Sequence, residues 1–143
     1  MIIPDANLLL YAYDSESPFH AEAARWWAKA LSGIEPVGLC PVVVFAFLRL
    51  STNPRVYDRP MTAAEASRHI ASWLARPNAR LLVAGPDHVR AVCDLIAKAG
   101  TAGNLVTAAQ IAALALEYSA TVHTADTDFA RFNGLAWENP LVA

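Results

Sequence analysis

The feature that most constrains this chain is the alternation of short apolar runs with longer segments that carry helix start and stop signals. A strand, a helix and a second strand in succession form a right-handed crossover that joins parallel strands. The pattern therefore predicts a parallel sheet with helices on both faces. Pro4 is a flaw in the first strand, because proline donates no hydrogen bond to a central ladder. The predicted strands are 1–4, 37–40, 81–84, 121–124 and 135–137.

Capping residues, prolines and glycines place the helices between these strands. Proline is favoured in the first helical turn and glycine just after the last, and Ser or Thr followed by Glu or Gln at the third position forms a capping box. The run VVVFAFLRL has strand-like residues, but the proline before it and the Asn-Pro turn after it favour a helix. The predicted helices begin at Ser17-Pro18, Pro41, Thr62, Pro86-Asp87 and Thr107, and end signals lie at Gly33, Arg76, Gly100 and Tyr118.

Length and composition are those of one globular domain, residues 1–143. Of the 143 residues, 55% are hydrophobic and 17% are charged, which is enough apolar material for a sizeable core. No apolar run is long enough to span a membrane, and the first residues lack the basic stretch of a signal peptide, so we expect a cytoplasmic protein. Cys40 and Cys93 lie in apolar sequence, and we expect both to be buried and reduced.

Charge is distributed unevenly along the chain. The net charge of −2 argues against a strong, indiscriminate nucleic-acid binder. Residues 1–35 and 100–143 each have a balance of −3, whereas residues 49–90 have +4 from seven arginines and three acids. An acidic region beside an arginine-rich one could bind a metal ion and a polyanion together. A mixed, solvated surface is the alternative, and we weight the two equally.

Three aspartates follow predicted strands. Asp5 ends the first strand, and Asp126 and Asp128 follow the fourth in the stretch HTADTDFARF. Ligands of open parallel sheets bind at the carboxyl ends of the strands, so the three acids converge if the first and fourth strands are neighbours. Converging carboxylates repel one another unless they share a cation, and oxygen ligands favour Mg²⁺ or Mn²⁺. The alternative is local, with Asp126 capping a short helix and Asp128 in its first turn.

Four stretches give the chain a family resemblance. In order along the chain, MIIPDANLLLYAYD, FLRLSTNPRV, NLVTAAQIAALALEYSATVHTADTDFARF and LAWENP resemble a PIN-domain protein of the VapC toxin type. The resemblance implies a three-layer α/β fold with about five parallel strands ordered 3-2-1-4-5, which makes the first and fourth strands neighbours. It also implies a Mg²⁺- or Mn²⁺-dependent endoribonuclease, the toxin of a toxin–antitoxin pair, which is a cytosolic homodimer inhibited by a VapB-like antitoxin.

Matched position by position, the resemblance assigns Asp5, Asp126 and Asp128 to catalysis and metal binding. Thr124 matches the family's hydroxyl residue, and Asn7 matches the polar residue that steadies the first loop. We expect both to hold carboxylates or water by hydrogen bonds. The candidates for binding RNA phosphate are Arg49, Thr52, Asn53 and Arg55. For Arg49 the alternative is a salt bridge at the end of its helix. Tyr57 or Trp137 could stack on a base, although we expect both to be packed in the fold.

Two positions depart from the family pattern. Ala46 stands at a position that is often Glu, and Ala108 stands where the third acid normally shares the metal with the first. Losing ligands from a hard-cation site lowers its charge and coordination number, so we expect this copy to be impaired. Three explanations stay open: a naturally degenerate toxin, an engineered inactive copy, or a metal still bound through the three aspartates and water.

A function of another class is a non-catalytic PIN-like module that binds RNA or an antitoxin, and it predicts binding that Asp5→Ala does not change. A phosphoacceptor receiver domain would need an Asp at the end of the third strand and a Lys after a later strand. Only Lys29 and Lys98 are present, and both lie in predicted helices. A dinucleotide-binding enzyme is less favoured still, because no G-x-G-x-x-G follows the first strand.

Three side chains near these motifs have structural predictions. Trp26 and Trp27 adjoin on one helix and point about 100° apart, so one should face the core and the other should be available to a groove for the antitoxin or a dimer partner. His123 precedes the acidic motif, and we expect it to pack on its strand rather than act as a base.

Overall fold

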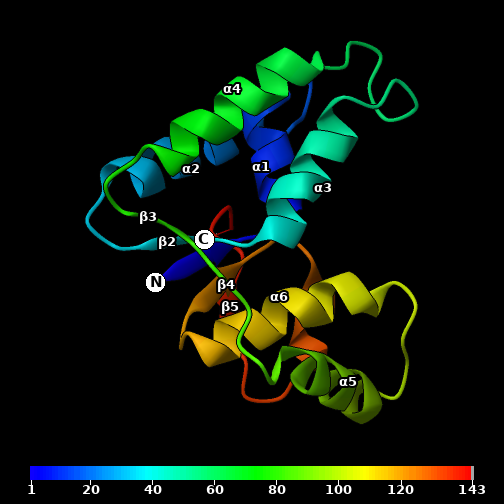
Figure 1. The fold of residues 1–143 in the computed structure, drawn as a ribbon. Helices are drawn as coiled ribbons and strands as arrows, with labels where there is room; N and C mark the ends of the chain where they lie inside the picture. Colours follow the sequence, from blue (N-terminus) through cyan, green and yellow to red (C-terminus); the bar gives the residue numbers. More distant parts are fainter. Residues whose placement is uncertain (143) are drawn as a thin grey trace.

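The computed structural model describes residues 1–142 and shows a five-stranded parallel sheet between two layers of helices (Figure 1). The strand order is β3-β2-β1-β4-β5, and every neighbouring pair is parallel. The predicted 3-2-1-4-5 order is confirmed, and it places the first and fourth strands side by side. The strands are β1 (Ile2–Pro4), β2 (Val37–Leu39), β3 (Ala79–Leu81), β4 (Thr121–His123) and β5 (Trp137–Glu138).

The helices divide between the two faces of the sheet. In the view of Figure 1 the first four lie above the sheet and the fifth and sixth lie below it. None of the helices in the described part of the chain is both long and apolar enough to cross a membrane. The helices are α1 (Ala6–Tyr13), α2 (His20–Ser32), α3 (Pro41–Ser51), α4 (Ala63–Leu74), α5 (His88–Ala99), α6 (Leu105–Glu117) and the 3₁₀ helix η1 (Thr127–Arg131).

The predicted helix signals hold where their bonds are local. The capping box of α4 is present, with the Glu65 amide donating to Thr62 Oγ1 at 3.1 Å. Helix α3 begins at Pro41, so the strand-like residues after it are helical as predicted. Gly100 ends α5 with a φ of +79°, a conformation that glycine adopts without the steric penalty of a side chain.

Two predicted helix starts are wrong. Helix α2 begins at His20 because Ser17 forms a turn first, its hydroxyl accepting from the Phe19 amide and its carbonyl from the His20 amide. Helix α6 begins at Leu105, so Thr107 lies inside the helix and does not cap it. The turn around Gly103, where φ is +60°, starts the helix two residues earlier than the predicted capping box.

The third strand also differs from its prediction. The sequence placed it at 81–84, where the residues are most apolar, but β3 pairs with β2 from Ala79 to Leu81. Leu81 and Val83 are exposed at this edge of the sheet. Leu82 between them is buried, and its amide donates to the Leu39 carbonyl at 2.9 Å, so the apolar run alternates between exposed and buried residues at the edge of the sheet.

Pro4 lies in the central strand without breaking its ladder. The Ile2 amide donates toward β2, and the Asp5 amide donates to the His123 carbonyl on the β4 side at 2.9 Å. Since amides alternate between the two sides, the nitrogen of Pro4 faces β2. Pairing between β1 and β2 is at Ile2↔Val37 only, so the missing donor falls beyond the end of that ladder.

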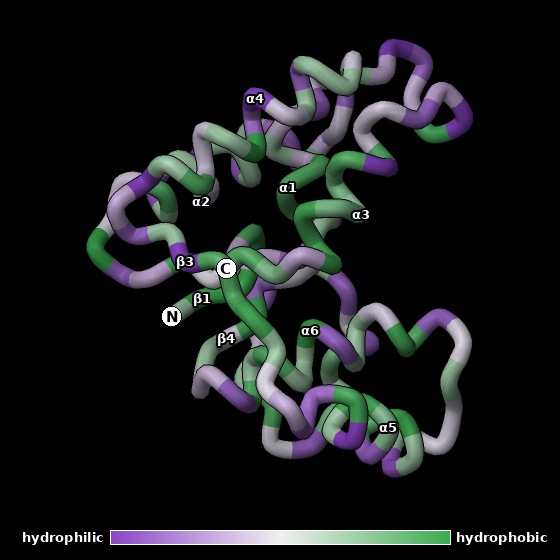
Figure 2. The backbone as a smooth tube through the Cα atoms, in the orientation of Figure 1, coloured by the Kyte–Doolittle hydropathy of each residue, from purple (hydrophilic) through white to green (hydrophobic). Residues whose placement is uncertain are grey.

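A cluster of aromatic side chains joins α1, α2, α3 and α4 above the sheet. Trp73 is fully buried, and its ring centroid lies 4.8 Å from that of Phe47 and 5.5 Å from that of Trp27. Its indole nitrogen donates to the Tyr13 hydroxyl at 2.8 Å. Trp27 is thus the core-facing member of the tryptophan pair. Figure 2 shows how apolar residues gather along the strands and inner helix faces, with hydrophilic residues concentrated in the outer loops.

Trp26 and His123 form a polar link between α2 and the sheet. The indole of Trp26 donates to His123 Nδ1 at 3.0 Å, and His123 Nε2 lies 2.9 Å from Glu138 Oε1. His123 is buried on β4, so its predicted packing role is confirmed. Burial lowers the pKa of His123, while Glu138 and Glu35 act in the opposite direction.

The cysteine prediction is half right. Both thiols are free, and Cys40 is buried at the end of β2, but Cys93 is exposed on α5. Helix α5 has no fully buried residue, because it covers only the outside of α6. An apolar sequence around Cys93 therefore did not imply burial.

Candidate active site

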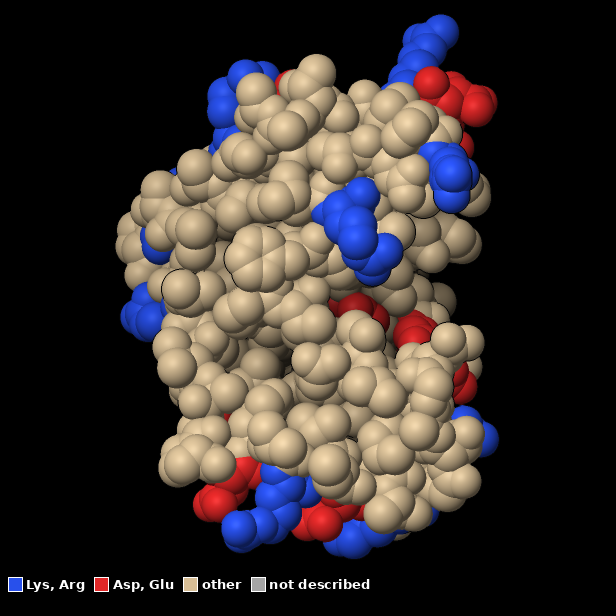
Figure 3. Space-filling model, turned by 45° about the vertical axis from the view of Figure 1, so that its right-hand side comes forward, with Lys and Arg blue, Asp and Glu red and all other residues tan. Residues whose placement is uncertain are grey.

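The carboxyl ends of β1 and β4 bring two distant parts of the chain together. These strands pair from Ile2↔Thr121 to Pro4↔His123, so the residues that follow them, Asp5 and Thr124, emerge side by side. Figure 3 shows acidic side chains recessed in a hollow between the upper and lower halves of the molecule, with a basic side chain at its upper margin. The carboxyl ends of β1 and β4 form the edge of the sheet at which the sequence predicted a site.

Thr124 is the centre of a hydrogen-bond network at this edge. Its fully buried hydroxyl donates to Asp5 Oδ2 at 2.7 Å and accepts from the Asp126 amide at 2.9 Å. Asp5 Oδ1 accepts from the Ala6 amide at 2.7 Å and so caps α1. One hydroxyl therefore fixes the carboxylate that follows β1 and the loop that follows β4.

Asn7 ties the same two segments together a second time. Its Nδ2 donates to Thr124 Oγ1 at 3.3 Å, and its Oδ1 accepts from the Ala125 amide at 3.4 Å. Both bonds are long, but they cross from α1 to the loop after β4. Asn7 thus lies where the sequence placed it, against the loop that carries the acids.

The two late aspartates have different environments. Asp126 Oδ1 accepts from the Asp128 amide at 2.9 Å, which makes Asp126 the cap of η1, and Asp128 lies exposed in the first turn. The capping alternative is therefore observed. The capping bond uses Oδ1 of Asp126 and leaves the other carboxylate oxygen able to bind a cation.

Burial dominates the electrostatics of Asp5. Desolvation raises the pKa of Asp5 above its usual range, and the charge of Asp126 acts in the same direction. The hydrogen bonds from Thr124 and Ala6 act in the opposite direction without cancelling the effect of burial. An ionised Asp5 is thus destabilising in the free protein, and a bound cation would relieve it.

The residues present fit a hard cation held by few protein ligands. Within residues 1–142, no group of three or more Asp, Glu, His or Cys side chains is arranged to hold a metal. Ala108 is buried in α6 and offers a methyl group, and Cys40 has a pKa raised to about 12, so it offers no thiolate. The carboxylates of Asp5 and Asp126 lie close enough for the charge of Asp126 to raise the pKa of Asp5. Two carboxylates are sufficient for Mg²⁺, which typically binds one or two of them and completes its coordination shell with water.

The predicted phosphate-gripping residues divide into two groups. Thr52 and Asn53 hold their own turn: Thr52 Oγ1 donates to the Leu48 carbonyl at 2.7 Å, and Asn53 Oδ1 accepts from the Arg55 amide at 2.9 Å. Arg49 is exposed on α3, and Arg55 is exposed on the following loop. The salt bridge considered for Arg49 is absent from the described part of the chain.

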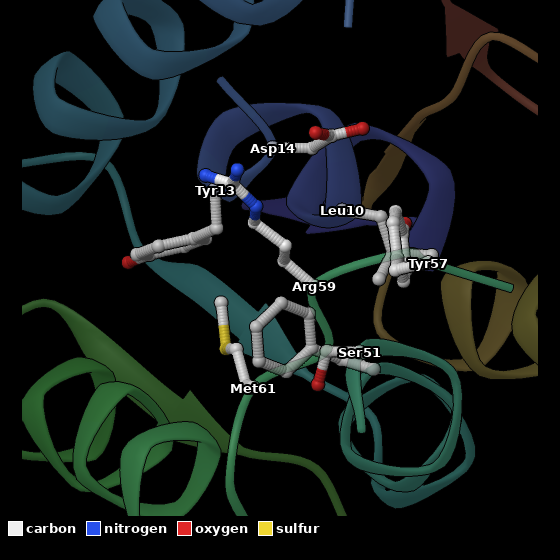
Figure 4. Close-up of a pocket in the computed structure, with 8 residues that line it drawn as sticks. Leu10, Tyr13, Asp14, Ser51, Tyr57, Arg59 and Met61 are labelled. Atoms are coloured by element: carbon white, nitrogen blue, oxygen red, sulfur yellow. The ribbon is translucent and has the colours of Figure 1, made fainter. Parts of the chain in front are cut away.

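A second hollow lies at the far ends of α1 and α3, and sequence reasoning did not find it. It is closed by the loop between α3 and α4 (Figure 4). No local signal marks its residues, because they come from three segments that only packing brings together. Its lining includes Tyr13, Asp14, Ser51, Tyr57, Arg59 and Met61.

Comparison with known proteins identifies the family from the sequence and relatives of the same fold among solved structures. The PIN domain family matches residues 2–135. Ribonuclease VapC33 of Mycobacterium tuberculosis is 45% identical over 141 residues, which cover 99% of each chain. The structure of FitAB bound to an IR36 DNA fragment has a TM-score of 0.71 at 20% identity, covering 100% of this chain and 97% of that one. The crystal structure of Mycobacterium tuberculosis VapC20, a sarcin–ricin loop cleaving toxin, has a TM-score of 0.69 at 18% identity, covering 91% and 93%.

Proposed function

The chain belongs to the PIN-domain family, and from this premise we propose that it is an endoribonuclease that hydrolyses RNA phosphodiesters as the toxin of a toxin–antitoxin pair. The observation that carries the proposal is the network in which Thr124 holds Asp5 and the Asp126 loop at one edge of the sheet. Two acids fixed on rigid strand ends are suited to positioning a cation and a phosphodiester. The name of the relative VapC33 supports the same activity.

Asp5 and Asp126 are the carboxylates that would hold Mg²⁺ or Mn²⁺, with Asp128 at the edge of the site. When bound, such an ion supplies charge for the scissile phosphate and lowers the pKa of a bound water. Thr124 keeps Asp5 oriented, and its hydrogen bond favours the ionised form of that carboxyl. Asn7 keeps the Asp126 loop against α1. Arg49, which is exposed on α3, would contact RNA phosphate.

We further propose that this copy is impaired. Position 108, where the family pattern has a further acid, is the buried Ala108. The site then has two carboxylates close enough to affect each other's charge, Asp5 and Asp126. A site with fewer anionic ligands binds a divalent ion more weakly, and even indirect ligand losses lower affinity or activity about 10–100-fold.

The expected partners follow from the family. A VapB-like antitoxin would inhibit the chain, and the half-buried Trp26 of α2, which lines an open hollow with Lys29 and His123, would be available to it. We expect a homodimer, in keeping with the exposed apolar residues Leu81, Val83 and Val89 along β3 and α5.

The decisive experiment measures cleavage of a structured RNA with and without Mg²⁺. We expect Ala108→Asp to cleave at least tenfold faster than the parent chain, and we expect chelation of the metal to abolish cleavage. Asp5→Asn in the Ala108→Asp background should remove the activity, whereas Asp94→Asn, an exposed acid on α5, is the matched control and should not. If Ala108→Asp with Mg²⁺ cleaves no faster than its Asp5→Asn form, the nuclease proposal is wrong.

The absence of a three-acid group among residues 1–142 favours a second candidate, a PIN-like module that binds RNA or an antitoxin without cleaving. This candidate predicts binding of the same RNA without cleavage in every variant. It also predicts that Asp5→Asn leaves the affinity unchanged.

A further inference from the structure

The hollow between the far ends of α1 and α3 contains a buried polar group without a partner. Ser51 is 4% exposed, and its hydroxyl has no hydrogen-bond partner among the described residues. An unpaired buried hydroxyl is unfavourable by about 1–3 kcal/mol, so such groups are normally bonded to protein or to a bound molecule. Ser51 lines a cavity of about 50 Å³ that opens to the surface.

Backbone hydrogen bonds order the loop that follows Ser51. The Ser51 carbonyl accepts from the Met61 amide at 2.8 Å, and the Asn53 carbonyl accepts from the Val56 and Tyr57 amides. These bonds fix the loop after α3, whose residues Tyr57, Arg59 and Met61 line the cavity. The hollow is therefore a built feature of the fold.

The chemistry of the lining selects the kind of ligand. Asp14 contributes a carboxylate, which disfavours a phosphate group and favours N–H donors. Tyr57 and Arg59 contribute a ring and a guanidinium group to the lining. The pKa of Tyr57 is raised first by burial and then by the charge of Asp14, which agrees with the closeness of Tyr57 to Asp14. The combination suits a flat, neutral, hydrogen-bonding group.

The size of the cavity sets how much of a ligand enters it. A single water needs only about 10–15 Å³, while a cavity that encloses a benzene ring has about 150 Å³. A volume of about 50 Å³ admits the edge of a planar ring but not the whole ring. The remainder of the ring would lie against Tyr57 and Arg59. Unpaired RNA bases are bound in this way, by contacts to their edges and by stacking on aromatic or Arg side chains.

The cavity and the acidic site lie at opposite ends of α1. Asp14 follows Asp5 by nine residues along α1, a separation of roughly 13 Å along a helix. Arg49 on α3 and Arg55 and Arg59 on the loop after it are all exposed, and Arg59 lines the cavity. A short single-stranded segment could reach from one site to the other along this basic surface.

We propose that this cavity receives the edge of one unpaired nucleobase of the RNA, displaced from the scissile bond, and thereby sets base preference. The proposal rests on the proposed ribonuclease function. Guanine should bind best, since its Watson–Crick edge presents two adjacent N–H donors to Asp14. Uracil should bind worst, because two of the three groups on that edge are carbonyls.

The test measures the affinity of the full chain for short single-stranded RNA oligonucleotides with one position varied among the four bases. Fluorescence polarisation in the presence of a metal chelator separates binding from cleavage. We expect guanine to be preferred over uracil about tenfold at one position. Ser51→Ala and Asp14→Asn should remove that preference, while Ser67→Ala, an exposed serine on α4, is the control that should retain it.

Thermal unfolding of Ser51→Ala gives an independent readout. Since the hydroxyl has no internal partner and its burial is unfavourable, the variant should be at least as stable as the parent. A large loss of stability would mean that the hydroxyl is bonded inside the protein, and it would overturn the proposal.

The remaining outcomes separate this proposal from the proposed function. Equal binding of all four oligonucleotides, or a preference that Ser51→Ala leaves intact, would refute the base pocket alone and favour a peptide side chain as the occupant. Failure of every oligonucleotide to bind would refute the RNA-directed function itself, and the base pocket with it.

Discussion

Replacing Thr124 by Val tests the centre of the acidic site, because Val keeps the shape of the side chain and removes its hydroxyl. The buried hydroxyl donates to Asp5 at 2.7 Å and accepts from the Asp126 amide at 2.9 Å. A hydrogen bond to a charged group contributes about 1.5–3 kcal/mol, and leaving an amide unpaired costs about 1–3 kcal/mol. Both partners are partly exposed, so the low ends apply. We expect the free energy of unfolding to fall by about 2–3 kcal/mol.

Denaturant and thermal unfolding at neutral pH measure this loss. For a chain of 143 residues it corresponds to a fall in Tm of about 7–10 °C. Thr124→Ser is the matched control, because it keeps the hydroxyl and loses only a methyl group, at about 1 kcal/mol. An unfolding free energy of the Val variant within 0.5 kcal/mol of the parent, or an equal loss in the Ser variant, would refute the assigned network.

The pH dependence gives a second check on the same variant. The hydroxyl of Thr124 stabilises the ionised form of Asp5, so its removal raises the Asp5 pKa further above the usual range. The variant then binds a proton at higher pH than the parent in the folded state. The stability difference should therefore be largest at neutral pH and should shrink as the pH falls through the raised pKa. A difference that grows on acidification would contradict this reasoning.

Three further predictions concern the same fold and site. Asp5→Asn should stabilise the protein at neutral pH, because the raised pKa of Asp5 means that folding disfavours its charged form. In thermal unfolding this gain in stability should vanish at pH values below the usual Asp pKa. A gain in stability that persists at those pH values would contradict the prediction. Trp73→Ala should lower the unfolding free energy by about 3–5 kcal/mol in denaturant titration, because it empties the aromatic cluster, and a loss under 1 kcal/mol would contradict that packing. Ala108→Asp should make Tm depend on Mg²⁺, with a gain of about 2.7 kcal/mol at 100 times the dissociation constant, whereas equal Mg²⁺ responses of parent and variant would place position 108 outside the metal site.

Local signals account for the parts of the fold that the sequence predicted well. The capping box at Thr62, the proline at Pro41 and the glycine at Gly100 act on bonds within a few residues of themselves, and each holds in the structure. The start of α6 was missed because a turn at Gly103 competes with the Thr107 signal, and which of them is used depends on how the chain enters the helix.

The convergence of Asp5, Asn7, Thr124 and Asp126 was predictable from strand order. Once the first and fourth strands are neighbours, the residues that follow them must meet, and the family resemblance supplied that order. Their hydrogen bonds agree with the positions expected from sequence. Asp128 matched the same motif, yet its side chain is exposed in the first turn of η1.

By itself, the sequence determined the alternation of strands and helices, the order of the sheet through its family, and the acids at the strand ends. Only the tertiary structure decided which apolar residues are exposed, as at Leu81 and Cys93, and which polar ones are buried, as at Ser51. The physical reason is one of range. Caps, turns and periodicity act over one or two helical turns, whereas burial and the cavity beside Ser51 depend on segments that meet only when the helices pack.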